Sequence, residues 1–384
     1  EESLKRFHPW VFSGAIAAID DGVEEGELVR VISSNGEFIA VGMYQIGSIA
    51  VRVLTFKDTV IDHGFWISRL KSALDMRRAI SIADNPHNNT YRLVHGEGDN
   101  IPGLVIDCYG PTAVMQAHCV GIHLMRHAIS EALVEVMGSR IQNIYYKSET
   151  TLPFKADVEH ENSFIYGGDE NDVAMENGLK FHVDWLRGQK TGFFLDQKYN
   201  RRAVGRLAAG RTVLDCFTHT GSFALNAARG GAKHVTAVDV SEFAVACARE
   251  NARRNGLSDV MECVAANVFD LLPQLEQQPK RYDFIILDPP AFTKSRKTTQ
   301  RAMTGYKEIN YRAMRLLPRG GYLATCSCSH FATEELFLKM LRSAAKDAGV
   351  QLRQIEARQQ CCDHPILWGV EETNYLKFYL FQVV

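Results

Sequence analysis

The feature that most constrains the fold is a regular alternation of apolar and amphipathic segments in the second half of this 384-residue chain. Apolar runs begin near residues 212, 234, 260, 283 and 321, and helical patterns begin near 221, 242, 306 and 333. Apolar strands that alternate with helices are typical of a parallel sheet with helices on both faces. We therefore predict an α/β fold with a doubly wound sheet over residues 180–384, completed by strands near 351 and over 375–383.

Shorter elements organise the first half of the chain. Runs with strand composition, separated by Gly, Asn and Ser turns, predict a small β-barrel over residues 1–67; these runs are Leu28–Ile32, Phe38–Gly42 and Ile49–Phe56. Mixed helix and strand patterns predict a central α+β domain over residues 68–179. Its expected elements are a helix over 65–83, a hairpin-like pair over 93–110, a strand over 112–117, a helix over 121–138, a strand over 141–146 and a solvated acidic loop or hairpin over 157–176.

Two segments of the last domain have the composition of a nucleotide-type pocket. The run VLDCFTHTGSFAL, Val213 to Leu225, predicts a strand, a glycine-containing loop and a helix, so the amides at 220–222 can approach a ligand closely. About 20 residues further on, a second strand ends at Asp239, whose carboxylate can bind both hydroxyls of a ribose. The pair predicts an S-adenosylmethionine pocket. Taken singly, the first is also compatible with an ordinary strand–helix turn and Asp239 with a helix cap.

A third segment places an acid at the same sheet edge. The apolar run Phe284 to Leu287 is followed by Asp288-Pro289-Pro290. Proline has a fixed φ and no N–H donor, so it stops the strand and presents Asp288 at the carboxyl edge, where open α/β sheets bind ligands. The run LATCSCS near the end of the chain adds two thiols, Cys326 and Cys328, as candidate nucleophiles. The alternative is that both are small buried core groups.

Charge and composition narrow the classes of partner. The net charge is −2 and the pI is about 6.7, so no global basic field indicates nucleic acid. Basic residues nevertheless gather beside the expected reaction centre, which favours a polyanion over a merely solvated face. They are Arg187, Lys190, Lys198, Arg201 and Arg202, and then Lys294, Arg296, Lys297 and Arg301.

Cysteine usage and hydropathy indicate the compartment. The chain has nine cysteines, an odd number without a C-x-x-C pair, which predicts reduced thiols and no zinc or other metal site. It has no 18-residue apolar run and no secretory segment, so we expect a cytoplasmic protein that neither spans a membrane nor is exported. The chain opens without methionine, which leaves a lost leader or a trimmed terminus open.

The motifs together resemble one family. HPWVFSGAI (8–16), KTGFFLDQKYNR (190–201), DPPAF and CSCS, in this order, are similar to the bacterial 23S ribosomal RNA 5-methylcytosine methyltransferases, and the similarity extends to HPILWGVEETNYLKFYLFQV. The resemblance implies an N-terminal PUA domain, a central α+β domain and a C-terminal Rossmann-like methyltransferase domain. It also implies S-adenosylmethionine as cofactor and 23S ribosomal RNA, naked or partly assembled, as partner. It leaves a homodimer open.

The resemblance assigns roles to individual residues. Asp239 would bind the ribose, and Asn267 would meet the adenine at a place that the family commonly fills with Asp. Asp196, Gln197 and Arg201 would line the entrance for cofactor or substrate. The cofactor loop would comprise Phe217, Thr218, Thr220, Gly221, Ser222 and Phe223.

The implied chemistry requires a thiol. A thiolate adds to carbon 6 of cytosine, so that carbon 5 can attack the methyl sulfonium, while Asp288 stabilises charge at ring nitrogen 3. The resemblance to the family assigns the nucleophile to Cys328, although Thr325-Cys326-Ser327 resembles the nucleophile motif of related enzymes. Period-2 alternation would point Cys326 and Cys328 to one face, about 6.5 to 7 Å apart. Because Ala291 stands where some relatives carry a second cysteine, product release needs another base, water or Cys326.

Two other functions remain open from the residues. One is an exocyclic-amine or guanine-nitrogen RNA methyltransferase, which needs the Asp-Pro-Pro turn and a stacking aromatic such as Phe292 but no thiol. The other is a noncatalytic RNA-binding or ribosome-assembly protein that retains a cofactor pocket. The presence of Asp239, Asp288 and Cys328 argues against this second function.

Overall fold

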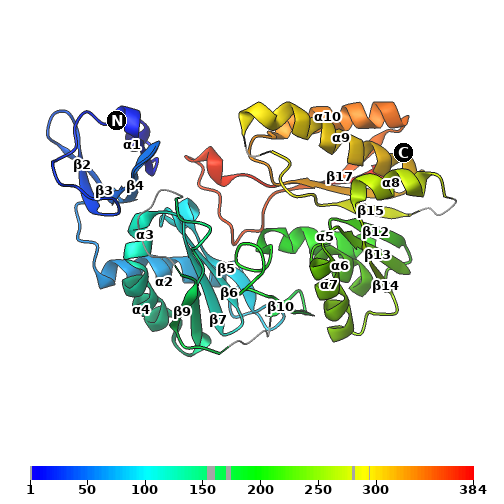
Figure 1. The fold of residues 1–384 in the computed structure, drawn as a ribbon, viewed down its shortest axis with the longest axis horizontal. Coiled ribbons are helices and arrows are strands. Elements are labelled where there is room, and N and C mark those ends of the chain that lie inside the picture. The colour runs from blue at the N-terminus through cyan, green and yellow to red at the C-terminus, as the bar shows by residue number, and fades with distance from the viewer. Residues whose placement is uncertain (1, 154–160, 170–173, 279–281, 294) are drawn as a thin grey trace. The chain divides into compact units, whose positions relative to one another are not determined.

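The structure is a computed structural model, and it describes residues 2–153, 161–169, 174–278, 282–293 and 295–384 (Figure 1). The chain divides into two compact units. The first runs to Gly178 and also takes in Val183–Leu195 and Cys362–Thr373. The second comprises Leu179–His182, Asp196–Cys361 and Asn374–Val384. The predicted three-domain boundaries at 67/68 and 179/180 stay a prediction.

The N-terminal part of the first unit is a four-stranded antiparallel sheet in the order β1-β4-β3-β2. Each of its three pairings contains a register shift, and such bulges bend a sheet. The inward residues form a small apolar core with Leu4 of the preceding helix. The elements are α1 (Glu2–Lys5), β1 (Trp10–Phe12), β2 (Leu28–Ile32), β3 (Phe38–Tyr44) and β4 (Ile49–Thr55).

The rest of the first unit is α+β. Its five-stranded sheet has the order β5-β6-β7-β8-β9, mostly antiparallel, and β7 and β8 are parallel. The helix expected from residue 65 begins at His63, because Asp62 accepts a hydrogen bond from the Phe65 amide. The elements are α2 (His63–Ala79), β5 (Thr90–His95), β6 (Leu104–Tyr109), β7 (Thr112–Ala117), α3 (Val120–Leu124), α4 (Arg126–Met137), β8 (Asn143–Tyr146), β9 (Ser163–Tyr166) and β10 (Ala174–Glu176).

Two expectations for this part need correction. The single helix predicted over 121–138 is two helices, separated at Met125. The acidic stretch over 157–176 was expected to be a loop or hairpin, yet its described part contains β9, which extends the central sheet beside β8. Residues 157–160 and 170–173 lie outside the described residues.

The second unit contains a seven-stranded sheet in the order β14-β13-β12-β15-β16-β18-β17. The first five strands in this order are parallel, and β18 runs antiparallel to both β16 and β17. The predicted doubly wound sheet and its two closing strands are therefore confirmed. The strands of this sheet are β12 (Thr212–Cys216), β13 (His234–Asp239), β14 (Met261–Ala265), β15 (Phe284–Leu287), β16 (Tyr322–Ser327), β17 (Leu352–Arg358) and β18 (Lys377–Val383), and the short strand β11 (Leu179–Phe181) of the same unit lies outside it.

Helices cover both faces of this sheet, with α5, α6 and α7 on one side and α8, α9 and α10 on the other (Figure 1). The helices α5 and α8 were not predicted, and α8 contains Pro273 in its interior. The helices are α5 (Lys198–Leu207), α6 (Ser222–Arg229), α7 (Glu242–Arg254), α8 (Val268–Glu276), α9 (Thr299–Leu316) and α10 (Glu334–Ala348).

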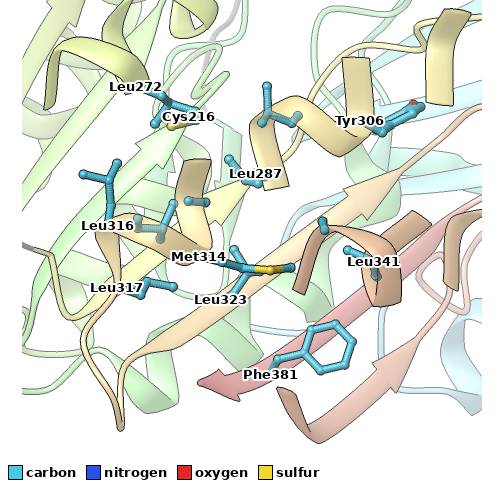
Figure 2. Packing of buried hydrophobic residues seen from close by; sticks show 14 of the residues in the cluster. Cys216, Leu272, Leu287, Tyr306, Met314, Leu316, Leu317, Leu323, Leu341 and Phe381 are labelled. Carbon is cyan, nitrogen blue, oxygen red and sulfur yellow. The ribbon is translucent and has the colours of Figure 1, made fainter. Parts of the chain in front are cut away.

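The core on one face of the sheet fixes the strands that carry the site. It joins buried residues of β12, β15, β16 and β18 to those of α8, α9 and α10, as Figure 2 shows for Leu287, Met314, Leu323 and Phe381. Burying such side chains stabilises the fold by about 1.5 to 3 kcal/mol each. The carboxyl ends of the parallel strands are thereby held at one edge.

Candidate functional site

A loop with unusual backbone geometry connects β12 to α6. Phe217 and His219 have φ values of 63° and 51°, and Gly221 has a φ of 82°. Residues other than glycine rarely adopt this left-handed region, and strain of this kind gathers at ligand sites. A Cβ on Gly221 would lie 3.0 Å from Ala248 Cβ, so the loop also needs glycine for close packing on α7.

Asp215, in β12, fixes this loop through hydrogen bonds. Its buried Oδ2 accepts hydrogen bonds from Thr218 Oγ1 at 2.5 Å and from the Ala224 amide at 2.9 Å. Burial raises the pKa of Asp215 to about 7. Thr218, a predicted cofactor residue, therefore turns its hydroxyl inward, and its contribution to the loop is structural.

Asp239 stands at the carboxyl end of β13, beside the same loop. Its Oδ2 accepts from the His219 amide at 2.9 Å and its Oδ1 from the Ser241 amide at 3.0 Å. The N-cap of α7 is Ser241, whose hydroxyl accepts from the Ala244 amide, so the helix-cap reading of Asp239 is wrong. Each carboxylate oxygen retains acceptor capacity for a further donor.

The loop offers donors that suit a polar ligand. Within the described residues, the backbone N–H groups of Thr220, Ser222 and Phe223 have no acceptor. The Thr220 hydroxyl is buried and also has no partner in this part of the chain. Unsatisfied donors at the start of a helix, with a carboxylate on the next strand, match the needs of a nucleoside with a charged tail.

Asn267 occupies the next position along the edge. It is exposed and caps α8, and its Oδ1 accepts from the Phe269 amide at 3.1 Å. Its amide group remains able to donate to an adenine edge. Aromatic rings lie nearby: the centroid of Phe217 is 6.5 Å from that of Phe269 and 6.4 Å from that of Phe292.

Asp288 follows β15 as predicted, and β15 ends at Leu287 before the two prolines. Its Oδ1 accepts from Gln197 Nε2 at 2.9 Å. Burial, with the charge of Asp196 nearby, raises the pKa of Asp288 to about 7. Asp196 in turn accepts from the Tyr375 hydroxyl at 2.8 Å.

Arg201 belongs to the same cluster. It is 1 % exposed, and its Nη1 lies 3.4 Å from Ser222 Oγ at the start of α6. Its positive charge opposes the rise of the Asp288 pKa. The predicted residues Asp196, Gln197, Arg201 and Asp288 are thus brought together at the sheet edge.

The two cysteines differ sharply in environment. Cys326 is the fifth residue of β16 and is completely buried, whereas Cys328 lies one residue beyond the strand and is partly exposed. Burial, together with the charge of Asp288, raises the pKa of the Cys326 thiol well above its usual value. The expectation that both cysteines lie on the strand end is therefore wrong for Cys328, which the strand does not include.

Side chains from two other elements hold the residues that flank Cys328. The hydroxyl of Tyr306, in α9, forms hydrogen bonds with Ser327 Oγ at 3.1 Å and Ser329 Oγ at 3.0 Å. Lys377, the first residue of β18, donates from Nζ to the Ser329 carbonyl at 2.8 Å. The segment is thereby fixed on both sides of the thiol.

The basic residues divide into buried and exposed groups. Lys198 and Arg201 are buried, so the expectation that they face a polyanion needs correction. Arg187, Lys190 and Arg202 are exposed, as are Arg296, Lys297 and Arg301 at the start of α9. Lys294 lies outside the described residues.

Several residues of this site were not predicted from the sequence. Asp215 and Phe269 belong to motifs in which other residues were singled out. Tyr306, Tyr375 and Lys377 come from segments that are remote in the sequence. For Asp215, the signal was an acid inside an otherwise apolar buried strand. For Lys377, the signal was a lysine that opens the apolar run KFYLF.

Across the parts of the chain that the structure covers, no group of three or more His, Cys, Asp or Glu side chains is arranged to hold a metal ion. Among the helices within those parts, none combines the length and apolar character needed to cross a bilayer.

Comparison with known proteins gives two domain matches. Residues 164–382 match the S-adenosylmethionine-dependent methyltransferase family, and residues 1–56 match the PUA-like domain family. Among curated proteins, ribosomal RNA large subunit methyltransferase I of Erwinia tasmaniensis is 37 % identical, covering 100 % of this chain and 97 % of its own. The protein of the same name from Tolumonas auensis is 39 % identical, covering 98 % of this chain and 96 % of its own.

Solved structures agree on the fold. A candidate SAM-dependent methyltransferase from Streptococcus mutans superposes with a TM-score of 0.85 at 24 % identity, covering 100 % of this chain and 97 % of that one. A candidate methyltransferase solved with SAH gives a TM-score of 0.86 at 23 % identity, with the same coverage. At these identities the likeness concerns the fold alone.

Proposed function

Because the chain belongs to the S-adenosylmethionine-dependent methyltransferases, in the family of ribosomal RNA large subunit methyltransferase I, we propose that it methylates carbon 5 of a cytosine in 23S ribosomal RNA. The reaction proceeds through a covalent adduct with Cys328. S-adenosylmethionine is the cofactor and supplies the methyl group. Because the proposed substrate is ribosomal RNA, we infer that the reaction takes place in the cytoplasm.

The residues around the β12–α6 loop suit this cofactor. The amides of Thr220, Ser222 and Phe223 and the Thr220 hydroxyl have no partner among the described residues, and we expect them to bind its polar tail. Asp239 would accept from the ribose hydroxyls while keeping its two backbone bonds. Asn267 would donate to the adenine, and Phe217, Gly221 and Gln197 would shape the walls of the pocket.

The observation that carries the proposal is the contrast between the two thiols. In the run Thr325 to Ser329, Cys328 alone is accessible, and the four residues around it are buried. Only an accessible thiolate can add to carbon 6 of a base. Cys328 therefore forms the sulfur–carbon bond, and the ring electrons move to carbon 5, which then takes the methyl group.

Asp288 has the protonation behaviour that this addition needs. With a pKa of about 7, its carboxyl group is partly protonated near neutral pH and can donate to ring nitrogen 3 as charge develops there. After methyl transfer, the proton on carbon 5 must leave, and the electrons of that bond expel Cys328. Ala291 supplies no thiol for this step, and the predicted alternative Cys326 is buried with a raised pKa and so stays protonated, which leaves water or another base to take the proton.

The substrate side of the proposal rests on exposed cations. Arg296, Lys297 and Arg301 follow Asp288 closely in the chain and are exposed, the first two in a 3-10 turn before α9 and Arg301 in the first turn of α9. Phosphates contacted by such residues release counterions, which favours RNA binding. RNA in either naked or partly assembled form would satisfy them.

Trapping with RNA that contains 5-fluorocytosine tests the mechanism. Fluorine at carbon 5 cannot leave as a proton does, so a thiol enzyme stays covalently attached to the RNA. We expect both the wild-type protein and Cys326→Ala to form the adduct. Cys328→Ala should form no adduct and no methylated product, while it still binds S-adenosylmethionine.

The other outcomes overturn specific parts of the proposal. An adduct with Cys328→Ala but not with Cys326→Ala would reverse the assignment of the nucleophile. Methyl transfer without any adduct would favour an exocyclic-amine or guanine-nitrogen methyltransferase. Absence of transfer from labelled cofactor to total RNA would favour a noncatalytic role in ribosome assembly.

A further inference from the structure

The lysine beside Cys328 has a position that the mechanism above does not use. Lys377 opens β18, which runs antiparallel to β16, and its register partner is Ser327, the residue immediately before Cys328. Its Nζ donates to the carbonyl of Ser329, the residue immediately after Cys328. The ammonium group therefore lies against the short segment that presents the thiol.

Among the residues that the structure describes, no carboxylate accepts a hydrogen bond from Lys377 or forms an ion pair with it. The residue is 9 % exposed, and the group that accepts a hydrogen bond from its Nζ is the neutral Ser329 carbonyl. A buried ammonium is costly unless an anion compensates it. Burial lowers the pKa of Lys377 to about 8, and the charges of Cys328 and Glu334 act in the opposite direction.

Glu334 is the other anion near Lys377, and it has a separate partner. It lies in the first turn of α10 and accepts a hydrogen bond from the Tyr379 hydroxyl. From α9, the uncharged hydroxyl of Tyr306 contacts this segment, where it is shared between Ser327 and Ser329. An anion at Cys328 would thus complete the environment of Lys377.

We propose that Lys377 is a positioning residue that holds Cys328 as a thiolate, through its charge, and holds the Cys328 segment in place through the Ser329 carbonyl. The inference rests on the proposed function, because it concerns the nucleophile assigned there. A thiolate is the reactive form of cysteine, and a neighbouring lysine increases its share at neutral pH. Addition to carbon 6 removes that negative charge, and expulsion of Cys328 restores it beside the ammonium group.

The test measures thiol alkylation as a function of pH, with neither RNA nor cofactor present. Iodoacetamide labelling of Cys328, followed by peptide mass spectrometry, gives the pH at half-maximal rate. An opposite charge within about 4 to 6 Å lowers a pKa by about 1 to 3 units. We therefore expect Lys377→Met to react at least about tenfold more slowly at pH 7 and to shift the profile upward by at least about one unit.

Matched variants separate charge from structure. Lys377→Arg keeps the positive charge and should retain most of the wild-type profile. Lys339→Met makes the same replacement at an exposed position of α10 and should change nothing. The exposed thiol of Cys362, labelled in the same samples, serves as an internal reference. If Lys377→Met does not fold, as judged by thermal unfolding, Lys377→Gln takes its place.

The outcomes are distinguishable from those of the trapping experiment. An unchanged profile in a folded Lys377→Met or Lys377→Gln protein would overturn the inference. An equal decrease in the alkylation rate in Lys377→Arg and Lys377→Met would also overturn it, because that result would indicate a structural role that does not depend on charge. If the shift occurs but 5-fluorocytosine gives no adduct, the pairing of Lys377 with Cys328 stands and the proposed reaction fails.

Discussion

Replacement of Asp239 by alanine should weaken the binding of S-adenosylmethionine by about 1.5 to 3 kcal/mol. A hydrogen bond to a charged group contributes about this much, and the two ribose hydroxyls would both donate to this carboxylate. The loss corresponds to an affinity about 10- to 150-fold lower. The upper part of the range is expected, because Asp239 also accepts from the His219 amide and so holds the strained loop that carries the other contacts.

Calorimetric titration with the cofactor provides the measurement, and two further variants interpret it. Asp239→Asn keeps one acceptor oxygen for the His219 amide, so it should lose less affinity than Asp239→Ala. Asp259→Ala removes an exposed carboxylate that precedes β14 and should bind as the wild type does. An affinity of Asp239→Ala within twofold of the wild type would remove Asp239 from the pocket and with it the ribose contact.

Two further predictions concern the substrate. Because protonated Asp288 is the proposed donor and its pKa is raised to about 7, the rate of adduct formation should fall as pH rises through about 7. Asp288→Asn, whose amide always donates, should lack this alkaline decline, and a decline that persists would exclude Asp288 as the donor. Charge reversal at Lys297 and Arg301 should lower RNA affinity and reduce the slope of log K against log salt by about one for each lost contact, with cofactor affinity unchanged. An unchanged slope, measured by fluorescence anisotropy, would make both residues part of a solvated face.

The parts of the site that could be predicted from the sequence are those set by local chemistry. Pro289 and Pro290 end β15, and this alone brings Asp288 to the edge of the sheet. Asp239 follows the same rule, because a parallel strand that ends on an acid presents it beside the preceding loop. In both cases the signal lies within a few residues of the side chain that it places.

Residues that reach the site from remote segments could not be placed there from their local sequence alone. Tyr306 lies in the middle of α9, where its hydroxyl meets two serines of another element. Lys377 is set by the pairing of β18 with β16, and the register of a ladder cannot be read from one strand alone. The helix α8 forms although it contains Pro273, and its residues Leu272 and Leu275 pack into the core.

The two cysteines show how a register decides between identical residues. Alternation along a strand predicts that Cys326 and Cys328 share a face and therefore have similar access to the pocket. The ladder to β18, however, ends with the pair Ser327 and Lys377. Cys326, paired with Phe378, lies inside the ladder and is buried, whereas Cys328 lies outside it and is partly exposed. Because the antiparallel pairing stops between the two cysteines, only one thiol of the motif is accessible as a nucleophile. The last residue of β18 in that pairing is Lys377, which we propose holds the thiolate.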